Sequence, residues 1–229
     1  MAPPPHTVRL EPAFFDWSIM ADPARFWNRI ADKYAKHPIS DRPAYRRKLD
    51  ETQKRLSADM RVLEVGCGTG STAIEHAPHV ERIHATDLSE RMIEIGRQRA
   101  RDAGVVNIDF EAASLAEVAH RGERYDAVLA LSLLHLVDDL DVALASIHDM
   151  LEPGGLFVSN TACLADGMNW LRPIVAVGRW TGKLPPVAFL GRDRLLQSMH
   201  RCGFEIEHQY RPGKGRVVFL VARRGGGSP

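Results

Sequence analysis

Short apolar runs alternate with amphipathic segments through the middle of the chain. The apolar runs predict strands over residues 61–65, 82–86, 107–111, 125–131 and 156–160. Between them, apolar positions recur at helical spacing, which predicts helices from residue 71, over 89–103 and over 139–151. Ser89 suits the start of the second of these helices, and Gly104 suits its end. Strands that alternate with helices form a parallel sheet with helices on both faces.

Both ends of the chain extend this pattern. Residues 23–56 are predicted to be helical, with interruptions at Pro38 and Pro43 and a second helix over 45–56. Near the C-terminus, a helix over 192–202 precedes strands over 204–210 and 216–222. Their connection, Arg211-Pro-Gly-Lys-Gly, is too short for a crossover helix, so these two strands must pair antiparallel. We therefore predict an α/β fold with a doubly wound, seven-stranded sheet that is mostly parallel with an antiparallel final strand.

Residues 163–190 do not fit the alternation. This stretch is long, contains Trp170 and Trp180 beside several prolines, and lacks a partner strand. Long irregular stretches of this kind commonly act as lids over a pocket. We predict a lid insertion over 163–190 that covers the pocket together with residues 14–34. The predicted division is an N-terminal helical cover over 1–56 and a main domain over 57–229.

Composition narrows the classes of partner. The formal net charge is +1, whereas a dedicated nucleic-acid binder carries a basic surplus, so we expect no nucleic-acid partner. Cys67, Cys163 and Cys202 lie far apart without metal-ligand spacing, which predicts no metal site. No segment reads as a signal peptide or a bilayer-spanning run, so a cytoplasmic location is expected. The sequence does not predict an oligomeric state.

The strongest motif is Val62-Leu-Glu-Val-Gly-Cys-Gly-Thr-Gly. A buried strand runs here into a turn whose glycines allow the backbone to come close to a ligand. Glu64 stands just before the turn, and Asp87 stands at the end of the second predicted strand. The place of Asp87 suits a carboxylate that accepts hydrogen bonds from two ribose hydroxyls. The motif therefore predicts a ribose-bearing ligand at the carboxyl ends of the strands.

Residues 64–70, Glu-Val-Gly-Cys-Gly-Thr-Gly, resemble the first motif of Rossmann-like, class I S-adenosylmethionine-dependent methyltransferases. Further landmarks of that family follow in order, namely Asp87-Leu-Ser, Ala113-Ser, Tyr125-Asp-Ala-Val-Leu and Leu151-Glu-Pro-Gly-Gly. The resemblance runs from about residue 60 to 160 and resumes in the last two strands. It implies a Rossmann-like fold and an enzyme that takes a methyl group from S-adenosylmethionine, leaves S-adenosylhomocysteine and methylates a small-molecule acceptor.

The resemblance also implies which residues contact the cofactor. The methionine part would lie among the residues of the glycine-rich turn: Glu64, Gly66, Cys67, Gly68 and Gly70. The remaining contacts would be Asp87 on the ribose, Leu88 on the adenine, Ala113 and Ser114 at the adenine edge, and Leu131 beside the sulfonium. Met92 could touch the adenine as well, although its helical spacing with Ile95 favours a core role.

Two further residues are candidates by position. The segment from Phe26 to Tyr34 resembles the entry helix of small-molecule and quinone methyltransferases, which implies that Tyr34 reaches the cofactor carboxylate or covers the methyl group; a structural aromatic is equally consistent. His135 follows the fourth predicted strand and is the candidate general base for an acceptor that must lose a proton. A structural histidine at the strand end is the favoured alternative.

Other functions stay open at this point. A nicotinamide-dependent oxidoreductase uses a similar sheet, but its GxGxxG fingerprint differs from the GxGxG found here, where Ser71 takes the sixth position. A non-catalytic cofactor-binding protein is also consistent with the motif. The predicted lid combines apolar residues with Arg172, Arg179 and Lys183, so a lipid or quinone acceptor at a membrane surface is a further alternative. The Asn-Pro-Pro-Tyr motif of amino-directed nucleic-acid methyltransferases is absent.

Overall fold

A computed structural model describes residues 23–37, 39–180, 184–185, 187–212 and 216–226, with only the backbone of 179 and 180. Several predicted features lie outside this part of the chain: cover residues 14–22, the interruption at Pro38 and the basic residue Lys183.

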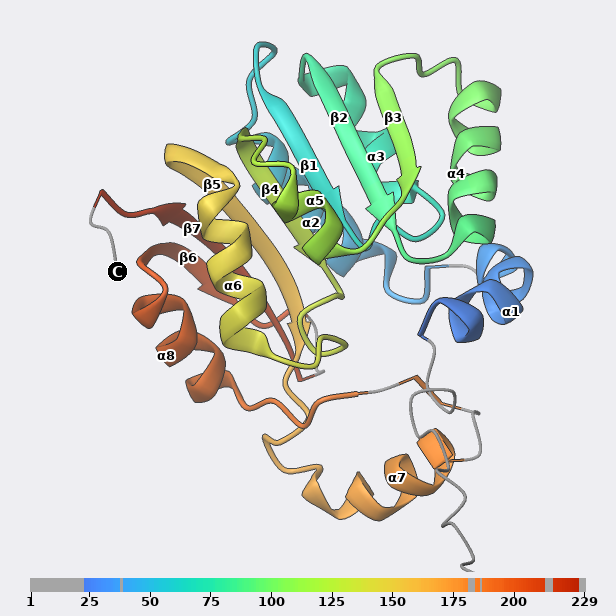
Figure 1. Cartoon of the computed structure of the whole chain (residues 1–229), viewed down its shortest axis with the longest axis vertical. Helices are drawn as coiled ribbons and strands as arrows, with labels where there is room; N and C mark the ends of the chain where they lie inside the picture. Colours follow the sequence, from blue (N-terminus) through green and yellow to red (C-terminus); the bar gives the residue numbers. More distant parts are fainter. Residues whose placement is uncertain (1–22, 38, 181–183, 186, 213–215, 227–229) are drawn as a thin grey trace, which may run out of the picture.

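A seven-stranded sheet forms the centre of the described structure, in the order β3-β2-β1-β4-β5-β7-β6. The strands are β1 (Arg61–Val65), β2 (Arg82–Asp87), β3 (Ile108–Ala112), β4 (Tyr125–Leu131), β5 (Leu151–Ala162), β6 (Phe204–Tyr210) and β7 (Val217–Arg224). β1 to β5 pair in parallel, and β7 runs antiparallel to both β5 and β6. The first strand, β1, lies inside the sheet, and later strands add on both sides of it (Figure 1). The predicted fold class is therefore confirmed.

Helices cover both faces of this sheet (Figure 1). The helices are α1 (Pro23–Lys36), α2 (Arg42–Gln53), α3 (Ser71–His76), α4 (Glu90–Asp102), α5 (Leu115–His120), α6 (Leu140–Asp149), α7 (Arg172–Trp180) and α8 (Arg192–Arg201). Of these, α1 and α7 lie beyond the carboxyl ends of the strands and do not cover a face (Figure 1). On one face, α5, α6 and α8 bury Val118, Leu144 and Leu195. On the other face, α3 and α4 bury Ala73 and Ile93, and α2 packs beside α3. Burial of these apolar side chains is the main stabilising contribution to such a layered fold.

Three differences from the sequence prediction exceed a shift of one or two residues and have an identifiable place in the structure. α2 begins at Arg42, because Asp41 accepts a hydrogen bond from the backbone N–H of Ala44 and Pro43 falls in the first turn, where no helical donor is needed. The helix α5 was not predicted; Ser114 and Glu117 start it with a reciprocal pair of capping hydrogen bonds. β5 extends to Leu151, through the Pro-Gly-Gly segment that was expected to separate helix from strand.

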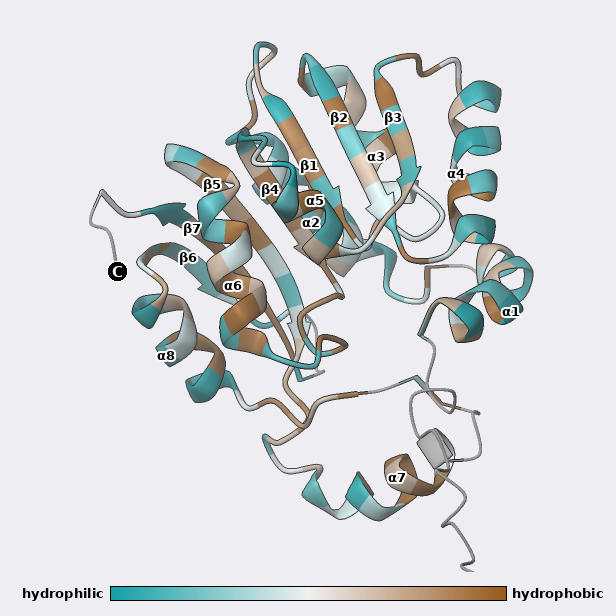
Figure 2. Cartoon of the chain, in the orientation of Figure 1, coloured by the Kyte–Doolittle hydropathy of each residue, from teal (hydrophilic) through white to brown (hydrophobic). Residues whose placement is uncertain are grey.

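The insertion between β5 and α8 leaves the sheet at its carboxyl end. Its two ends meet, because the backbone N–H of Ala165 donates to the carbonyl of Leu190 at 3.0 Å. Between them lie the short helix η3 (Asn169–Leu171) and α7, which carries the exposed apolar residues Ile174 and Val177. Figure 2 shows the hydrophobic part of α7 in brown. Figure 1 shows α1 and α7 at the same end of the molecule, beyond the carboxyl ends of the strands. No helix among the described residues is both long and apolar enough to cross a bilayer, and the cytoplasmic location stays a prediction.

The last glycine of the motif is required by packing. Gly70 has φ +74°, a backbone conformation that side chains disfavour, and an added Cβ would lie 2.7 Å from the ring of Phe110 on β3. Gly96 on α4 faces the same ring, where an added Cβ would lie 2.8 Å away. The absence of two side chains thus lets β3, α4 and the start of α3 close on one aromatic ring.

We predict that Gly70→Ala destabilises the protein more than Gly104→Ala does. Both glycines have positive φ, but an added Cβ at Gly104 meets nothing within 4 Å. Gly104→Ala should therefore cost only the backbone strain, about 1 kcal/mol. Gly70→Ala should cost roughly 1–3 kcal/mol more because the Phe110 ring must move. Chemical denaturation of both variants measures the difference, and equal costs would contradict the packing explanation.

Candidate functional site

Two cavities open where the strands end. The first, of about 470 Å³, is lined by residues that follow β2 and β3 and by α6, and we call it the α6-side cavity. The second, of about 840 Å³, is lined by α2, α3 and the ends of β1 and β5, and we call it the α2-side cavity. Five residues line both cavities: Tyr34, Gly66, Gly68, Leu131 and Ser132. The two cavities therefore adjoin at the glycine-rich turn and the end of β4.

The structure brings most of the predicted site residues together. The α6-side cavity is lined by Tyr34, Gly66, Gly68, Asp87, Leu88, Met92, Ala113, Ser114 and Leu131. Glu64 and Cys67 line the α2-side cavity. Gly70 and His135 line neither cavity. Gly70 instead makes room for Phe110, as described above.

Asp87 is tied to the glycine-rich turn. One carboxylate oxygen accepts a hydrogen bond from the backbone N–H of Gly68 at 2.9 Å, and the other accepts from the backbone N–H of Ser89 at 2.9 Å. Burial raises the pKa of Asp87, and the two backbone donors oppose that effect. Each carboxylate oxygen has a second lone pair, so Asp87 can still accept two hydrogen bonds from a ligand.

Glu64 is a buried carboxyl with an unpartnered oxygen. It stands one residue before the end of β1, only 2% exposed, and its Oε2 atom has no hydrogen bond within the described residues. Burial, helped by the negative charge of Asp87, raises the pKa of Glu64 to about 8. Unpartnered buried polar atoms are rare and costly. Glu64 therefore stands where a positively charged or hydrogen-bond-donating ligand group would satisfy it.

α1 is held over the turn by side-chain hydrogen bonds. The guanidinium of Arg99 on α4 donates to the hydroxyl oxygens of Thr69 and Ser71 and to the backbone carbonyl of Ala35 on α1. Further along α1, the Asn28 side-chain oxygen accepts from the hydroxyl of Ser89, the residue that caps α4. These contacts place the half-exposed Tyr34 ring beside Gly68, where an added Cβ would lie 3.9 Å from it.

Sequence reasoning missed two residues at the junction of the cavities. Ser132, just after β4, has φ +62°, which non-glycine residues adopt rarely. Its backbone N–H donates to the carbonyl of Asn160 at 2.7 Å, and the Asn160 side-chain amide donates to the Ser132 hydroxyl at 3.2 Å. Asn160 Oδ1 is buried without a partner among the described residues. A polar residue inside the buried strand β5 was the available signal, whereas a positive φ cannot be read from a serine.

His135 lines neither cavity, although Leu133 and Leu136 on either side of it line the α6-side cavity. Its carbonyl accepts a hydrogen bond from the backbone N–H of Ala188 at 2.8 Å, which joins the segment after β4 to the end of the insertion. Its ring atom Nδ1 is buried without a partner in the described part of the chain, and burial lowers the pKa of the imidazole. The predicted base is therefore half-buried at a junction between segments.

Comparison with known proteins agrees with this geometry. Residues 62–155 match a protein family described as a methyltransferase domain. A ubiquinone biosynthesis O-methyltransferase of Sinorhizobium medicae is 30% identical over 185 residues, which cover 81% of this chain and 62% of the relative. The corresponding protein of Agrobacterium fabrum is 27% identical over 134 residues, which cover 58% of this chain and 48% of the relative. The chain thus spans about half the length of the curated relatives it matches.

Solved structures share the fold. Magnesium protoporphyrin IX methyltransferase from Synechocystis, solved with bound S-adenosylhomocysteine, superposes with a TM-score of 0.69 at 16% identity, covering 88% of this chain and 98% of that one. The family match shows a methyltransferase domain over residues 62–155 of this chain, and the fold is the Rossmann-like fold of these solved structures.

We predict that Glu64→Gln stabilises the ligand-free protein at high pH. The pKa of Glu64 in the folded protein, about 8, lies above the ordinary value of 4.5. The free energy of unfolding is therefore highest below pH 4.5 and falls as the pH rises to 8, because the unfolded chain loses the Glu64 proton first. Glutamine cannot ionise, so the variant should gain on the order of a few kcal/mol at pH 8.5 and little at pH 5.

Melting temperatures at pH 5 and pH 8.5 measure this effect. Glu75→Gln is the matched control, since Glu75 lines the same cavity but is paired with Arg46 at the surface. A Glu64→Gln variant that is no more stable than wild type at pH 8.5 would show that Glu64 is not held in its neutral form.

Proposed function

We propose that the chain binds S-adenosylmethionine across the junction of the two cavities and transfers its methyl group to an oxygen atom of a small, partly apolar acceptor. The observation that carries this proposal is that two acidic residues stand at the glycine-rich turn. Glu64 has an unpartnered buried oxygen, and Asp87 is hydrogen-bonded to the backbone of the turn. The O-methyltransferase relatives support an oxygen acceptor. When bound, the cofactor would supply a methyl group whose carbon the acceptor oxygen attacks in line, with the thioether sulfur as the leaving group.

The residues present fit the parts of this cofactor. Glu64 would receive the ammonium group, which satisfies its buried carboxyl, and Asp87 would accept from the ribose hydroxyls through its free lone pairs. Leu88, Met92 and Ala113 supply the apolar walls of an adenine slot in the α6-side cavity. Met92, which the sequence assigned to the core, is 2% exposed and also lines this cavity.

Transfer requires alignment and exclusion of water more than acid–base chemistry. The acceptor oxygen would form the new C–O bond as the cofactor's S–C bond breaks, and the acceptor hydroxyl would release its proton to solvent. The chain's contribution is to place the acceptor oxygen at the junction, beside Leu131 and Ser132, on the side opposite the leaving sulfur. No positioned base is needed for an acceptor that is already ionised.

We propose that α1 and the insertion over 163–190 cover this junction. Pro23, Trp27 and Tyr34 of α1 and Pro185 of the insertion line the α6-side cavity, although they come from opposite ends of the chain. A cover of this kind excludes water from the sulfonium and retains the acceptor. This proposal divides the chain into an N-terminal cover over 1–56 and a main domain over 57–229.

The proposal is tested first by binding. Calorimetry should show that S-adenosylhomocysteine binds and that NAD does not. Asp87→Ala should weaken S-adenosylhomocysteine binding by about 2 kcal/mol because two ribose hydroxyls lose a charged acceptor. Asp193→Ala is the control, since that aspartate is exposed and lines neither cavity. NAD binding without S-adenosylhomocysteine binding would favour an oxidoreductase.

Turnover separates an enzyme from a protein that only binds the cofactor. The same fold occurs in the [4+2]-cyclase SpnF, at a TM-score of 0.65, 20% identity and coverage of 79% of this chain and 81% of that one, so fold alone does not settle the reaction. Release of S-adenosylhomocysteine in the presence of phenolic acceptors is the direct measurement. Binding without release for any acceptor would leave only cofactor binding.

His135→Ala distinguishes a base from a structural residue. Because His135 lines neither cavity, we expect a lower melting temperature and nearly unchanged turnover per folded molecule. A general base predicts the opposite result, a loss of roughly a hundredfold in turnover with cofactor affinity intact. Melting temperature and turnover on the same preparation, with the best phenolic acceptor, decide between these outcomes.

A further inference from the structure

The helix α1 carries two stripes of residues that meet different neighbours. Pro23, Trp27 and Tyr34 line the α6-side cavity. A second stripe, which begins at Asn28 and recurs at helical spacing, meets α4, the helix on which α1 packs. Because the two stripes belong to one rigid helix, the contacts with α4 determine where the aromatic side chains lie over the cavity.

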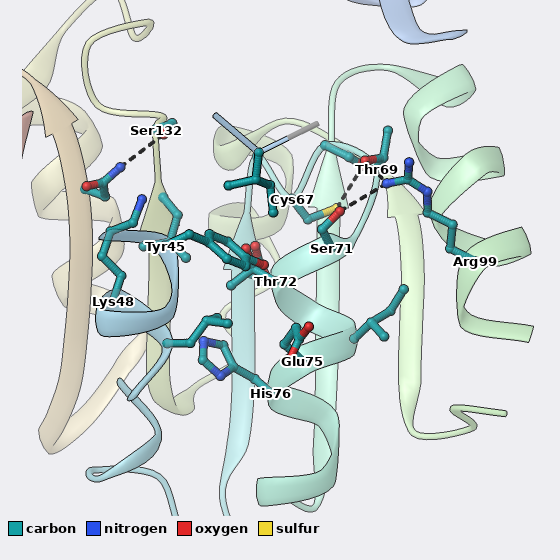
Figure 3. A pocket seen from close by; sticks show the side chains of 18 of the residues that line it. Tyr45, Lys48, Cys67, Thr69, Ser71, Thr72, Glu75, His76, Arg99 and Ser132 are labelled. Atoms are coloured by element: carbon teal, nitrogen blue, oxygen red, sulfur yellow. Dashed lines mark hydrogen bonds between the residues drawn. The ribbon is translucent and has the colours of Figure 1, made fainter. Parts of the chain in front are cut away.

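A cation on α4 holds the end of α1 that lies nearest the glycine-rich turn. Arg99 donates to the backbone carbonyl of Ala35 at 2.6 Å. Figure 3 shows the same guanidinium reaching Thr69 and Ser71 at the turn, with donor–acceptor distances of 2.6 and 3.0 Å. One attachment does not fix the direction of a helix, so a second contact has to set α1 over the α6-side cavity.

Asn28 supplies the second attachment, at the start of α4. Its side-chain oxygen accepts a hydrogen bond from the hydroxyl of Ser89 at 2.7 Å and another from the backbone N–H of Arg91 at 3.1 Å. The first N–H groups of a helix have no partner within the helix itself. Asn28 therefore caps α4 from a neighbouring helix, beside the cap that Ser89 provides for Met92.

Ser89 connects this cap with the wall of the α6-side cavity. It is fully buried, its hydroxyl oxygen accepts from the backbone N–H of Met92 at 3.1 Å, and its own N–H donates to Asp87 at 2.9 Å. Its hydroxyl has one hydrogen, which it donates to Asn28. Asp87 and Met92 line the α6-side cavity, whereas Asn28 and Ser89 line neither cavity. A change at Asn28 can therefore reach a ligand only through Ser89 and through the position of α1.

We propose that Asn28 is a positioning residue that couples the ribose-binding carboxylate to the position of α1 over the cofactor. The inference rests on the proposed binding of S-adenosylmethionine and assigns a role to a residue outside both cavities. Ribose hydroxyls bound to Asp87 restrain it and, through it, Ser89. Ser89 in turn holds Asn28, which places Trp27 over the cavity. Because such coupling is reciprocal, a contact that keeps α1 in place strengthens cofactor binding, and the cofactor strengthens that contact.

Calorimetry with S-adenosylhomocysteine on the full chain tests this coupling. Asn28→Leu keeps the approximate size of the side chain but removes the acceptor oxygen. Its affinity for S-adenosylhomocysteine should fall roughly 5- to 10-fold, the scale of a lost helix cap. Asn28→Asp retains an acceptor oxygen at the start of a helix, so its affinity should stay within about twofold of wild type.

Hydrogen exchange supplies a readout that does not depend on the affinity. Saturating S-adenosylhomocysteine should slow the exchange of the backbone N–H groups of α1 in wild type and in Asn28→Asp. In Asn28→Leu the ligand should protect α1 clearly less, because the link from Asp87 to α1 is broken, while the strands of the sheet stay equally protected. Equal protection of α1 in wild type and in Asn28→Leu would contradict the coupling.

Asp32→Asn is the matched control. Asp32 also joins α1 to α4, through an exposed ion pair with Arg91, and makes no hydrogen bond to Ser89 or Asp87 in the described structure. Exposed pairs contribute little, so this variant should bind S-adenosylhomocysteine within about twofold of wild type. The proposal is overturned if Asn28→Leu lowers the melting temperature without changing this affinity, or if Asn28→Asp binds as weakly as Asn28→Leu. Failure of wild type to bind S-adenosylhomocysteine at all is a different result, which refutes the proposed function itself.

Discussion

The hydrogen bond from the backbone of Gly68 to the carboxylate of Asp87 is the contact on which the site depends. It joins the end of β1 to the end of β2 and holds the glycine-rich turn open at the edge of the sheet. The turn has no side chains at 66 and 68 with which to pack. A charged acceptor on the neighbouring strand supplies the missing restraint and still presents lone pairs outward.

Glu64 illustrates the conflict between stability and binding. A carboxyl that is 2% exposed and has an unpartnered oxygen destabilises the ligand-free protein at neutral and higher pH. The same carboxyl stabilises a complex once a cationic group of the ligand lies beside it. Unsatisfied groups gather at this end of the sheet, where Asn160 Oδ1 and the His76 ring share the α2-side cavity with Glu64. The region is therefore incomplete in the free chain, which is the physical signature of a binding site.

The two sides of the site differ in character. The α6-side cavity is walled by apolar residues such as Leu88, Met92 and Leu133, and suits a flat aromatic base. The α2-side cavity carries Lys48, Glu64 and Asn160, and suits charged and hydroxylated groups. Because the cavities adjoin at Gly66, Leu131 and Ser132, the position where they meet is the one place open to molecules from both sides. Group transfer between two ligands requires this arrangement.

The sequence by itself determined the sheet, its parallel core and antiparallel end, and the place of the glycine-rich turn and Asp87. These follow from local patterns, because apolar runs, glycines and strand ends can be read within a few residues. The predicted start of α2 was wrong, and α5 was not predicted, because the capping hydrogen bonds of Asp41 and Ser114 decide where these helices begin. Only the tertiary structure decided that Gly70 makes room for Phe110, that His135 lines neither cavity, and that Ser132, Asn160 and Lys48 line one wall. These contacts join residues far apart in the chain, so they are set by how helices and strands pack, which no local pattern contains.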